Sequence, residues 1–260
     1  MWAFLVLAVF SLCVDAVVLD YSITTLKIQS QILDEERTIS VALPKGYPGE
    51  KDRYPVLYVL DAESQPSFLK TCSSVEQFSN EGVMPPTIVV GIWNVEGKRN
   101  RDMIPASVSH RPGSGGSLRF LQFIKTELID YVKNGYRTSD MSILYGGSNA
   151  GLFAVYAMLA DPGLFGACIA GSPMIGHCPE YMLELAEGFI HRPISKNMVL
   201  YMIYGTEDSP RVTDFVPDYH TFLEKNAPAR FKSYHVILKG EGHVPPSSLE
   251  RGLRTIFSGK

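Results

Sequence analysis

Hydrophobic residues occur along this chain in two patterns that alternate with each other. Short continuous runs, bounded by proline, glycine or polar residues, are typical of strands buried on both faces of a sheet. They occupy residues 56–60, 87–92, 141–144, 167–170, 198–204 and 233–238. Helical spacing of three and four is clear over residues 117–133, and further helices are expected at 149–160, 215–225 and 246–257 and between the runs at 56–60 and 87–92. The alternation predicts an α/β fold with a mainly parallel, doubly wound sheet and helices on both faces.

The beginning of this sheet has a different pattern. Residues 23–30 and 37–43 are rich in Ile, Thr and Val and enclose a polar, acidic segment, which predicts an antiparallel hairpin. No repeat, low-complexity tract or interdomain linker interrupts the rest of the chain. We therefore expect residues 17–260 to form a single domain.

Residues 1–16 are apolar from Trp2 to Phe10 and end at the small residue Ala16. This pattern predicts a secretory signal peptide cleaved after Ala16, and hence a secreted, extracellular protein. The apolar stretch is shorter than the roughly 20 residues that a membrane-spanning helix needs, so no membrane span is expected. Loss of Asp15 would change the net charge from -3 to -2.

Charge and composition exclude several classes of function. The 24 Lys and Arg residues and 27 Asp and Glu residues are interspersed, so no basic field attracts nucleic acid. Metal-ligand spacings are missing, and no nucleotide-binding glycine motif follows the first strand. We expect neither a metal nor a cofactor.

The cysteines leave their pairing open. Removal of residues 1–16 would take away Cys13 and leave Cys72, Cys168 and Cys178. In a secreted protein an odd number of cysteines favours one disulfide and one free thiol, and any of the three pairs fits the sequence.

The segment at residues 143–152 contains the most informative motif. An apolar strand runs into glycines, Ser148 and then directly into a helix. A serine in such a turn lies above the end of the sheet, and the small residues Gly146 and Ala150 would let the strand and the helix approach. The alternative interpretation is a glycine-rich turn with an incidental serine, because the motif alone has low specificity.

Candidate partners for Ser148 follow in the order that this motif requires. Asp208 comes just after the run at residues 198–204, and His243 comes just after the last strand, between glycine and proline residues. Glu207 is the alternative acid, because either neighbouring carboxylate could face the histidine. The other histidines, expected to be superficial or structural, are His110, His177, His191, His220 and His235.

These residues predict nucleophilic catalysis on a carbonyl group. Ser148 is a weak nucleophile unless His243 removes its proton, and Asp208 would orient the imidazole and stabilise its charged form. The oxyanion needs backbone donors. We expect one at Asn149 and the other in the turn after residue 61, at Ala62 or Glu63, with Ala62 preferred.

A charged segment follows the strand at residues 87–92. Trp93, Arg99, Arg101 and Asp102 could line a substrate cleft, but a solvated loop is the preferred interpretation.

Several motifs together look like the "Putative esterase" family, closest to its enterochelin esterase-like branch. They lie at residues 54–61, 90–92, 101–105, 120–128, 146–148 and 164–173. The resemblance implies an α/β-hydrolase fold and a serine esterase that hydrolyses carboxylic esters with Ser148, His243 and Asp208, and the predicted signal peptide adds that this esterase is secreted. Relatives act on siderophore lactones, feruloyl esters, thioesters and glycolipids, so a small-molecule ester is the expected partner. Two alternatives remain: a noncatalytic binding protein on this fold, and an acyltransferase that uses the same three residues.

Overall fold

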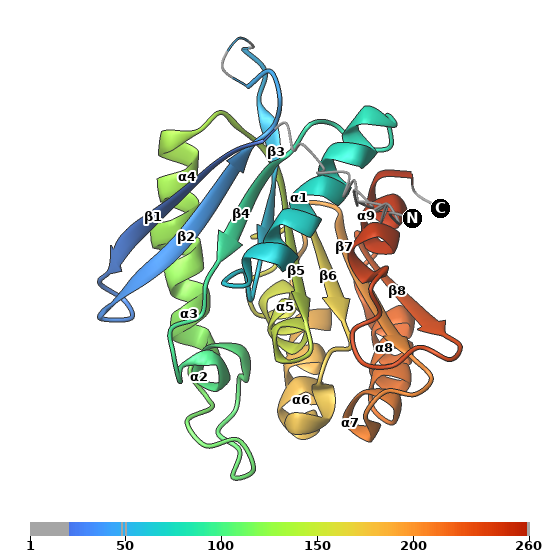
Figure 1. Cartoon of the computed structure of the whole chain (residues 1–260). Helices are drawn as coiled ribbons and strands as arrows, with labels where there is room; N and C mark the ends of the chain where they lie inside the picture. The colour runs from blue at the N-terminus through green and yellow to red at the C-terminus, as the bar shows by residue number, and fades with distance from the viewer. Residues whose placement is uncertain (1–20, 48, 50, 259–260) are drawn as a thin grey trace, which may run out of the picture.

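The part of the chain that a computed structural model describes, residues 21–47, 49 and 51–258, contains one eight-stranded sheet (Figure 1). The predicted signal peptide lies outside these residues. The strand order is β1-β2-β4-β3-β5-β6-β7-β8. The strands are β1 Ser22–Ser30, β2 Glu35–Leu43, β3 Tyr54–Val59, β4 Ile88–Ile92, β5 Thr138–Gly147, β6 Ala167–Gly171, β7 Met198–Gly205 and β8 Phe231–Leu238.

Antiparallel pairing is confined to the hairpin of β1 and β2 and to its junction with β4. All other neighbours, from β4 through β8, pair in parallel. The predicted mixed α/β fold, with a mainly parallel sheet and an N-terminal antiparallel hairpin, is therefore confirmed. Because the carboxyl ends of parallel strands share one edge, the loops that follow β3, β5, β6, β7 and β8 all emerge at that edge.

Helices cover both faces of the sheet (Figure 1). They are α1 Gln65–Asn80, α2 Arg99–Met103, α3 Ser117–Phe123, α4 Ile129–Gly135, α5 Asn149–Ala160, α6 Pro179–Ile190, α7 Pro210–Thr213, α8 Val216–Asn226 and α9 Ser248–Ser258. Helices α1 and α9 bury their apolar side chains in one core cluster, and α3 to α6 and α8 bury theirs in the other. The sheet therefore separates two hydrophobic layers.

Three of these helices were absent from the sequence prediction. Helices α2 and α7 have five and four residues, too few for a helical period to be visible in a sequence. Helix α6 has 12 residues and begins at Pro179, which is suited to a first helical turn. The predicted helix at residues 117–133 is interrupted by a π-helical turn, η1 Ile124–Leu128.

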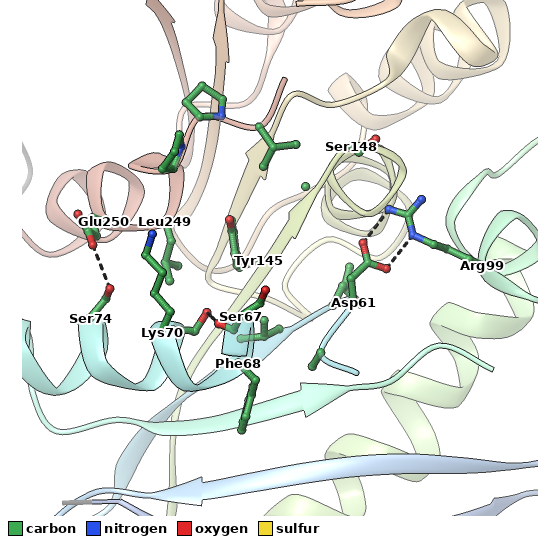
Figure 2. Close-up of a pocket in the computed structure, with 18 residues that line it drawn as sticks. Asp61, Ser67, Phe68, Lys70, Ser74, Arg99, Tyr145, Ser148, Leu249 and Glu250 are labelled. Carbon is green, nitrogen blue, oxygen red and sulfur yellow. Dashed lines mark hydrogen bonds and ion pairs between the residues drawn. The ribbon is translucent and has the colours of Figure 1, made fainter. Parts of the chain in front are cut away.

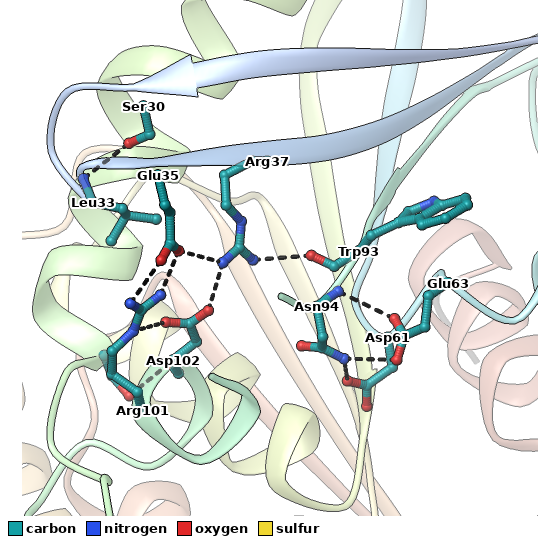
Figure 3. Close-up of polar contacts among 11 residues, drawn as sticks. Ser30, Leu33, Glu35, Arg37, Asp61, Glu63, Trp93, Asn94, Arg101 and Asp102 are labelled. Carbon is teal, nitrogen blue, oxygen red and sulfur yellow. Dashed lines mark hydrogen bonds and ion pairs between the residues drawn. The ribbon is translucent and has the colours of Figure 1, made fainter. Parts of the chain in front are cut away.

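A buried ion network joins the hairpin to α2 (Figure 3). The guanidinium of Arg37 on β2 donates to the Asp102 carboxylate at 2.8 Å, and both side chains have 0% exposure. Arg101 donates to Asp102 at 2.8 Å and also binds Glu35. Hydrogen bonds from Arg101 hold the pKa of the Glu35 carboxyl below its usual value. The Arg37 side chain also donates to the Trp93 carbonyl oxygen at 3.0 Å.

The expectation of a solvated charged loop is therefore wrong for Asp102, which is fully buried. Arg101 is only partly exposed because both of its carboxylate partners belong to the network. A charged segment has the same sequence pattern whether its side chains are solvated by water or paired with a distant strand. Here the oppositely charged partners, Arg37 and Glu35, come from β2.

The expected disulfide is also wrong. Cys72, Cys168 and Cys178 are buried and free, each packed in a hydrophobic cluster. Burial raises the pKa of the Cys178 thiol to about 11 and that of Cys72 to about 12, so both remain protonated and unreactive at neutral pH. Cys13 lies outside the described residues.

None of the helices within the described ranges combines the length and the apolar composition needed to cross a bilayer.

Asp102→Ala should lower the free energy of unfolding by about 3–5 kcal/mol, because it leaves the buried Arg37 charge without its partner. The measurement is equilibrium urea denaturation followed by circular dichroism. Glu36→Ala is the matched control, because it breaks the exposed pair between Glu36 and Lys27 and should cost less than about 1 kcal/mol. Equal losses for the two variants would contradict a central role for the Arg37–Asp102 pair.

Candidate active site

Ser148 lies in the sharp turn between β5 and α5. Its backbone has φ 62° and ψ -124°, a strained conformation for a residue with a side chain. The Ser148 N–H donates to the Gly171 carbonyl oxygen at 2.8 Å, which ties the turn to β6. A Cβ atom at Gly146 would lie 2.5 Å from the Ala150 carbonyl oxygen, so a glycine is needed there. The turn thus has the strand-turn-helix geometry that the motif predicts.

The structure brings Ser148, His243 and Asp208 together in one hydrogen-bonded chain. His243 Nε2 lies 2.8 Å from Ser148 Oγ, and His243 Nδ1 lies 2.6 Å from Asp208 Oδ1. The Asp208 side chain is buried, whereas 42% of the His243 side chain is exposed. Asp208 Oδ1 also accepts the Ser209 N–H at 2.6 Å, which fixes the carboxylate. A hydroxyl, an imidazole and a carboxylate connected in this order have the geometry that nucleophilic attack by a serine requires.

The loop that carries His243 is held against the ends of β6 and β7. The Val244 N–H donates to Ser172 Oγ at 2.7 Å, just after β6. A side chain at Gly205, the last residue of β7, would overlap the Glu241 carbonyl group. The close approach that this glycine allows brings the histidine loop beside Asp208.

Glu207 is not brought to His243. Its side chain is exposed to solvent, and its backbone N–H donates to the Glu241 carbonyl oxygen at 3.0 Å. The carboxylate within hydrogen-bond distance of the imidazole is that of Asp208.

The two expected oxyanion donors differ in their availability. Asn149 is the first residue of α5, where an N–H has no carbonyl partner within its own helix. The Ala62 N–H, in contrast, donates to the Ile92 carbonyl oxygen at 3.2 Å. It is used inside the fold and is not free to bind an oxyanion, so Ala62 was the wrong choice. Glu63 is the remaining alternative in that turn.

A cavity of about 390 Å³ opens beside Ser148, towards α1 and α9 (Figure 2). Phe68 and Leu249 give it apolar walls. The Tyr145 side chain also lines it, and burial raises the pKa of its hydroxyl to about 12, which keeps it neutral.

Arg99 and Asp61 form one side of this cavity. Arg99 Nε and Nη2 donate to the two carboxylate oxygens of Asp61 at 2.9 and 2.7 Å (Figure 2). Asn94 Nδ2 also donates to Asp61, at 2.6 Å, and to Glu63, at 2.9 Å (Figure 3). Arg99 therefore lines a cleft, as the alternative interpretation of this charged segment proposed, and does not belong to a solvated loop. No sequence pattern indicated this pair, because its members are 38 positions apart.

Within the described residues, no three His, Cys, Asp or Glu side chains cluster as metal ligands.

Comparison with known proteins decides the family. The "Putative esterase" family matches residues 30–238, which is most of the chain. The chain belongs to this family. The resemblance predicted from its motifs is thereby confirmed, and the esterase is a serine hydrolase of a family that acts on ester bonds.

Individual relatives agree with this assignment. The esterase is 24% identical over 246 residues to the ferri-bacillibactin esterase BesA of Bacillus subtilis, covering 85% of each chain. A crystal structure of an IroE-like serine hydrolase from Shewanella oneidensis is 29% identical, with a TM-score of 0.81, over 91% of this chain and 80% of that chain. The BES protein from Bacillus cereus, 24% identical with a TM-score of 0.80, shares the fold over 90% of this chain and 96% of that chain.

Proposed function

We propose that this esterase hydrolyses carboxylic esters through an acyl-enzyme, with Ser148 as the nucleophile. The observation that carries the proposal is the continuous hydrogen-bonded chain from Ser148 Oγ through His243 to Asp208. A binding protein without catalysis would have no need of this chain or of the strained backbone at Ser148.

The geometry supports a two-step mechanism. Ser148 Oγ attacks the ester carbonyl carbon while His243 Nε2 takes its proton, and Asp208 stabilises the imidazolium. The Asn149 N–H and, in our proposal, the Glu63 N–H bind the oxyanion. The intermediate collapses as His243 returns the proton to the departing alkoxide, which leaves the acyl group on Ser148.

Water completes the reaction. His243 removes a proton from a water molecule, the resulting hydroxide attacks the acyl carbon, and Ser148 recovers its proton when the acid departs. The exposure of the His243 side chain leaves solvent access to this position, which favours hydrolysis over transfer to another acceptor.

Two observations support a proposal about the substrate class. BesA is named as a ferri-bacillibactin esterase, and the Shewanella structure is described as IroE-like. We therefore propose siderophore esters as the first substrates to assay. The cavity beside Ser148 has room for a substituent of the ester.

We also propose that the esterase is exported and acts outside the cell. The support is the apolar segment at residues 1–16 and its small residue at Ala16.

The first prediction is that a fluorophosphonate probe labels the native protein at Ser148, because only an activated serine reacts with it. Peptide mass mapping locates the modified residue. Ser148→Ala should remove the label, whereas Ser67→Ala, which deletes another hydroxyl of the same cavity, should keep it. Labelling at a different serine would refute the proposed nucleophile.

The second prediction separates the two acids. Asp208→Asn should reduce kcat by about 10⁴, since the imidazole loses its orienting acceptor. Glu207→Gln, the matched neighbour, should retain nearly full activity because its side chain is exposed. The kcat of both variants is measured by hydrolysis of a chromogenic butyrate ester. A larger loss of kcat in Glu207→Gln than in Asp208→Asn would make Glu207 the orienting acid.

The third prediction concerns export. Expressed with its first 16 residues in a secreting host, the protein should be recovered from the medium with Val17 as its first residue. N-terminal sequencing and intact mass measure this. Retention inside the cell with residues 1–16 still attached would contradict secretion.

A further inference from the structure

A basic cluster lies outside the catalytic chain. It consists of His110 and Arg111 in the loop between α2 and α3, His177 in the short helix η2 Ile175–His177, and Arg211 on α7. His110 Nε2 and His177 Nδ1 are 2.9 Å apart and share a hydrogen bond. Positive charge at Arg111 and Arg211 acts on His177. Three segments distant in sequence thus converge on one buried imidazole.

Within the described residues, no carboxylate forms an ion pair with this cluster. The other arginines near the site have carboxylate partners, as Arg37 does in Asp102 and Arg99 does in Asp61. Arg111 and Arg211 make no ion pair or side-chain hydrogen bond with another described residue, and Arg111 Nε is a buried donor without an acceptor. Their positive charge is therefore uncompensated.

His177 shows the effect of this charge. Its side chain is 3% exposed, and its Nε2 atom has no partner among the described residues. Burial, followed by the charges of Arg111, His110 and Arg211, lowers the pKa of His177 to about 4. The His177 imidazole therefore stays neutral at physiological pH.

The cluster flanks the candidate active site. Helix α7 begins two residues after Asp208, and η2 begins three residues after Ser172, whose hydroxyl holds the histidine loop. Gly176 is packed so closely on α7 that a Cβ atom there would lie 2.8 Å from Arg211 Cα. In Figure 1, α2, α6 and α7 lie at the lower end of the molecule, where the central strands end, with α6 between α2 and α7.

The cavity beside Ser148 extends the other way, towards α1 and α9. A substrate whose ester group reaches Ser148 would have one part in that cavity, and a part that extends to the other side would approach η2 and α7. Guanidinium groups bind carboxylates and other oxyanions through two parallel hydrogen bonds. Among the described residues no carboxylate pairs with Arg111 or Arg211, so both guanidinium groups are available to a ligand.

We propose that Arg111, Arg211 and the His110–His177 pair form an anion-binding subsite for a negatively charged group of the ester substrate. This inference rests on the proposed function and makes it more specific. The esterase would prefer esters that have a carboxylate or a similar oxyanion on the part of the molecule outside the Ser148 cavity.

The test compares esters that differ only in charge. One pair is 4-nitrophenyl succinate and 4-nitrophenyl butyrate, with the charge on the acyl side. The other pair is 4-carboxyphenyl butyrate and phenyl butyrate, with the charge on the alcohol side. In one of the two pairs, Arg211→Gln should lower kcat/KM for the anionic ester about 10-fold, and the double change with Arg111→Gln should lower it about 100-fold.

The neutral esters should change by less than about twofold, because Arg211 is exposed and its loss leaves the catalytic chain intact. Arg230→Gln is the matched control: its side chain binds the Ser195 carbonyl oxygen, at the opposite edge of the sheet from the cluster. Arg211→Lys should recover part of the anionic preference. Parallel losses for charged and neutral esters, or no loss for either anionic ester, would overturn the subsite.

A binding measurement keeps this outcome separate from the proposed function. Succinate and 4-hydroxybenzoate, which cannot be hydrolysed, are titrated into the native protein and into Arg211→Gln by calorimetry. Binding that Arg211→Gln weakens, in a protein without esterase activity, would support the subsite and refute the proposed chemistry. Hydrolysis of neutral esters, together with carboxylate binding that Arg211→Gln does not change, would support the proposed chemistry and refute the subsite.

Discussion

Parallel hydrogen bonding between β5, β6 and β7 determines where the reactive groups of this protein meet. Gly147 pairs with Gly171, and Gly171 pairs with Ile203, so the three strands end side by side. The ladder continues beyond the strands, because the Ser148 N–H binds the Gly171 carbonyl and the Ser172 N–H binds that of Ile203. The backbone itself thus places the serine turn, before any side chain contributes.

The buried ion network provides a second level of organisation, on the hairpin side of the sheet. Arg37 and Asp102 would each be costly to bury alone, so β2 and α2 must dock together for the fold to form. Docking of α2 also places Arg99, which reaches Asp61 after β3. The Arg37–Asp102 contact therefore helps to position one wall of the cavity beside Ser148.

Charge is distributed unequally around Ser148. On the cavity side, Arg99 is neutralised by Asp61 in a bidentate pair. On the side of α7, Arg111 and Arg211 surround a neutral His177 without a carboxylate partner among the described residues. The first arrangement makes a wall of the cavity rigid, whereas the second leaves hydrogen-bond donors free for a ligand. This contrast distinguishes an arginine that supports the structure from one that is available for recognition.

The alternation of strands and helices, the hairpin and the serine turn could all be predicted from the sequence, because each depends on local spacing and on residue size. The sequence also provided the order of Ser148, Asp208 and His243 along the chain. Three outcomes required the folded structure: Asp208 and not Glu207 contacts His243, the Ala62 N–H is occupied by the Ile92 carbonyl oxygen, and Asp102 is buried against Arg37. Those outcomes depend on which atoms meet across long sequence separations, such as the 95 positions between Ser148 and His243. Two neighbouring carboxylates are alike in sequence, and packing alone turns one of them towards the imidazole and leaves the other in solvent.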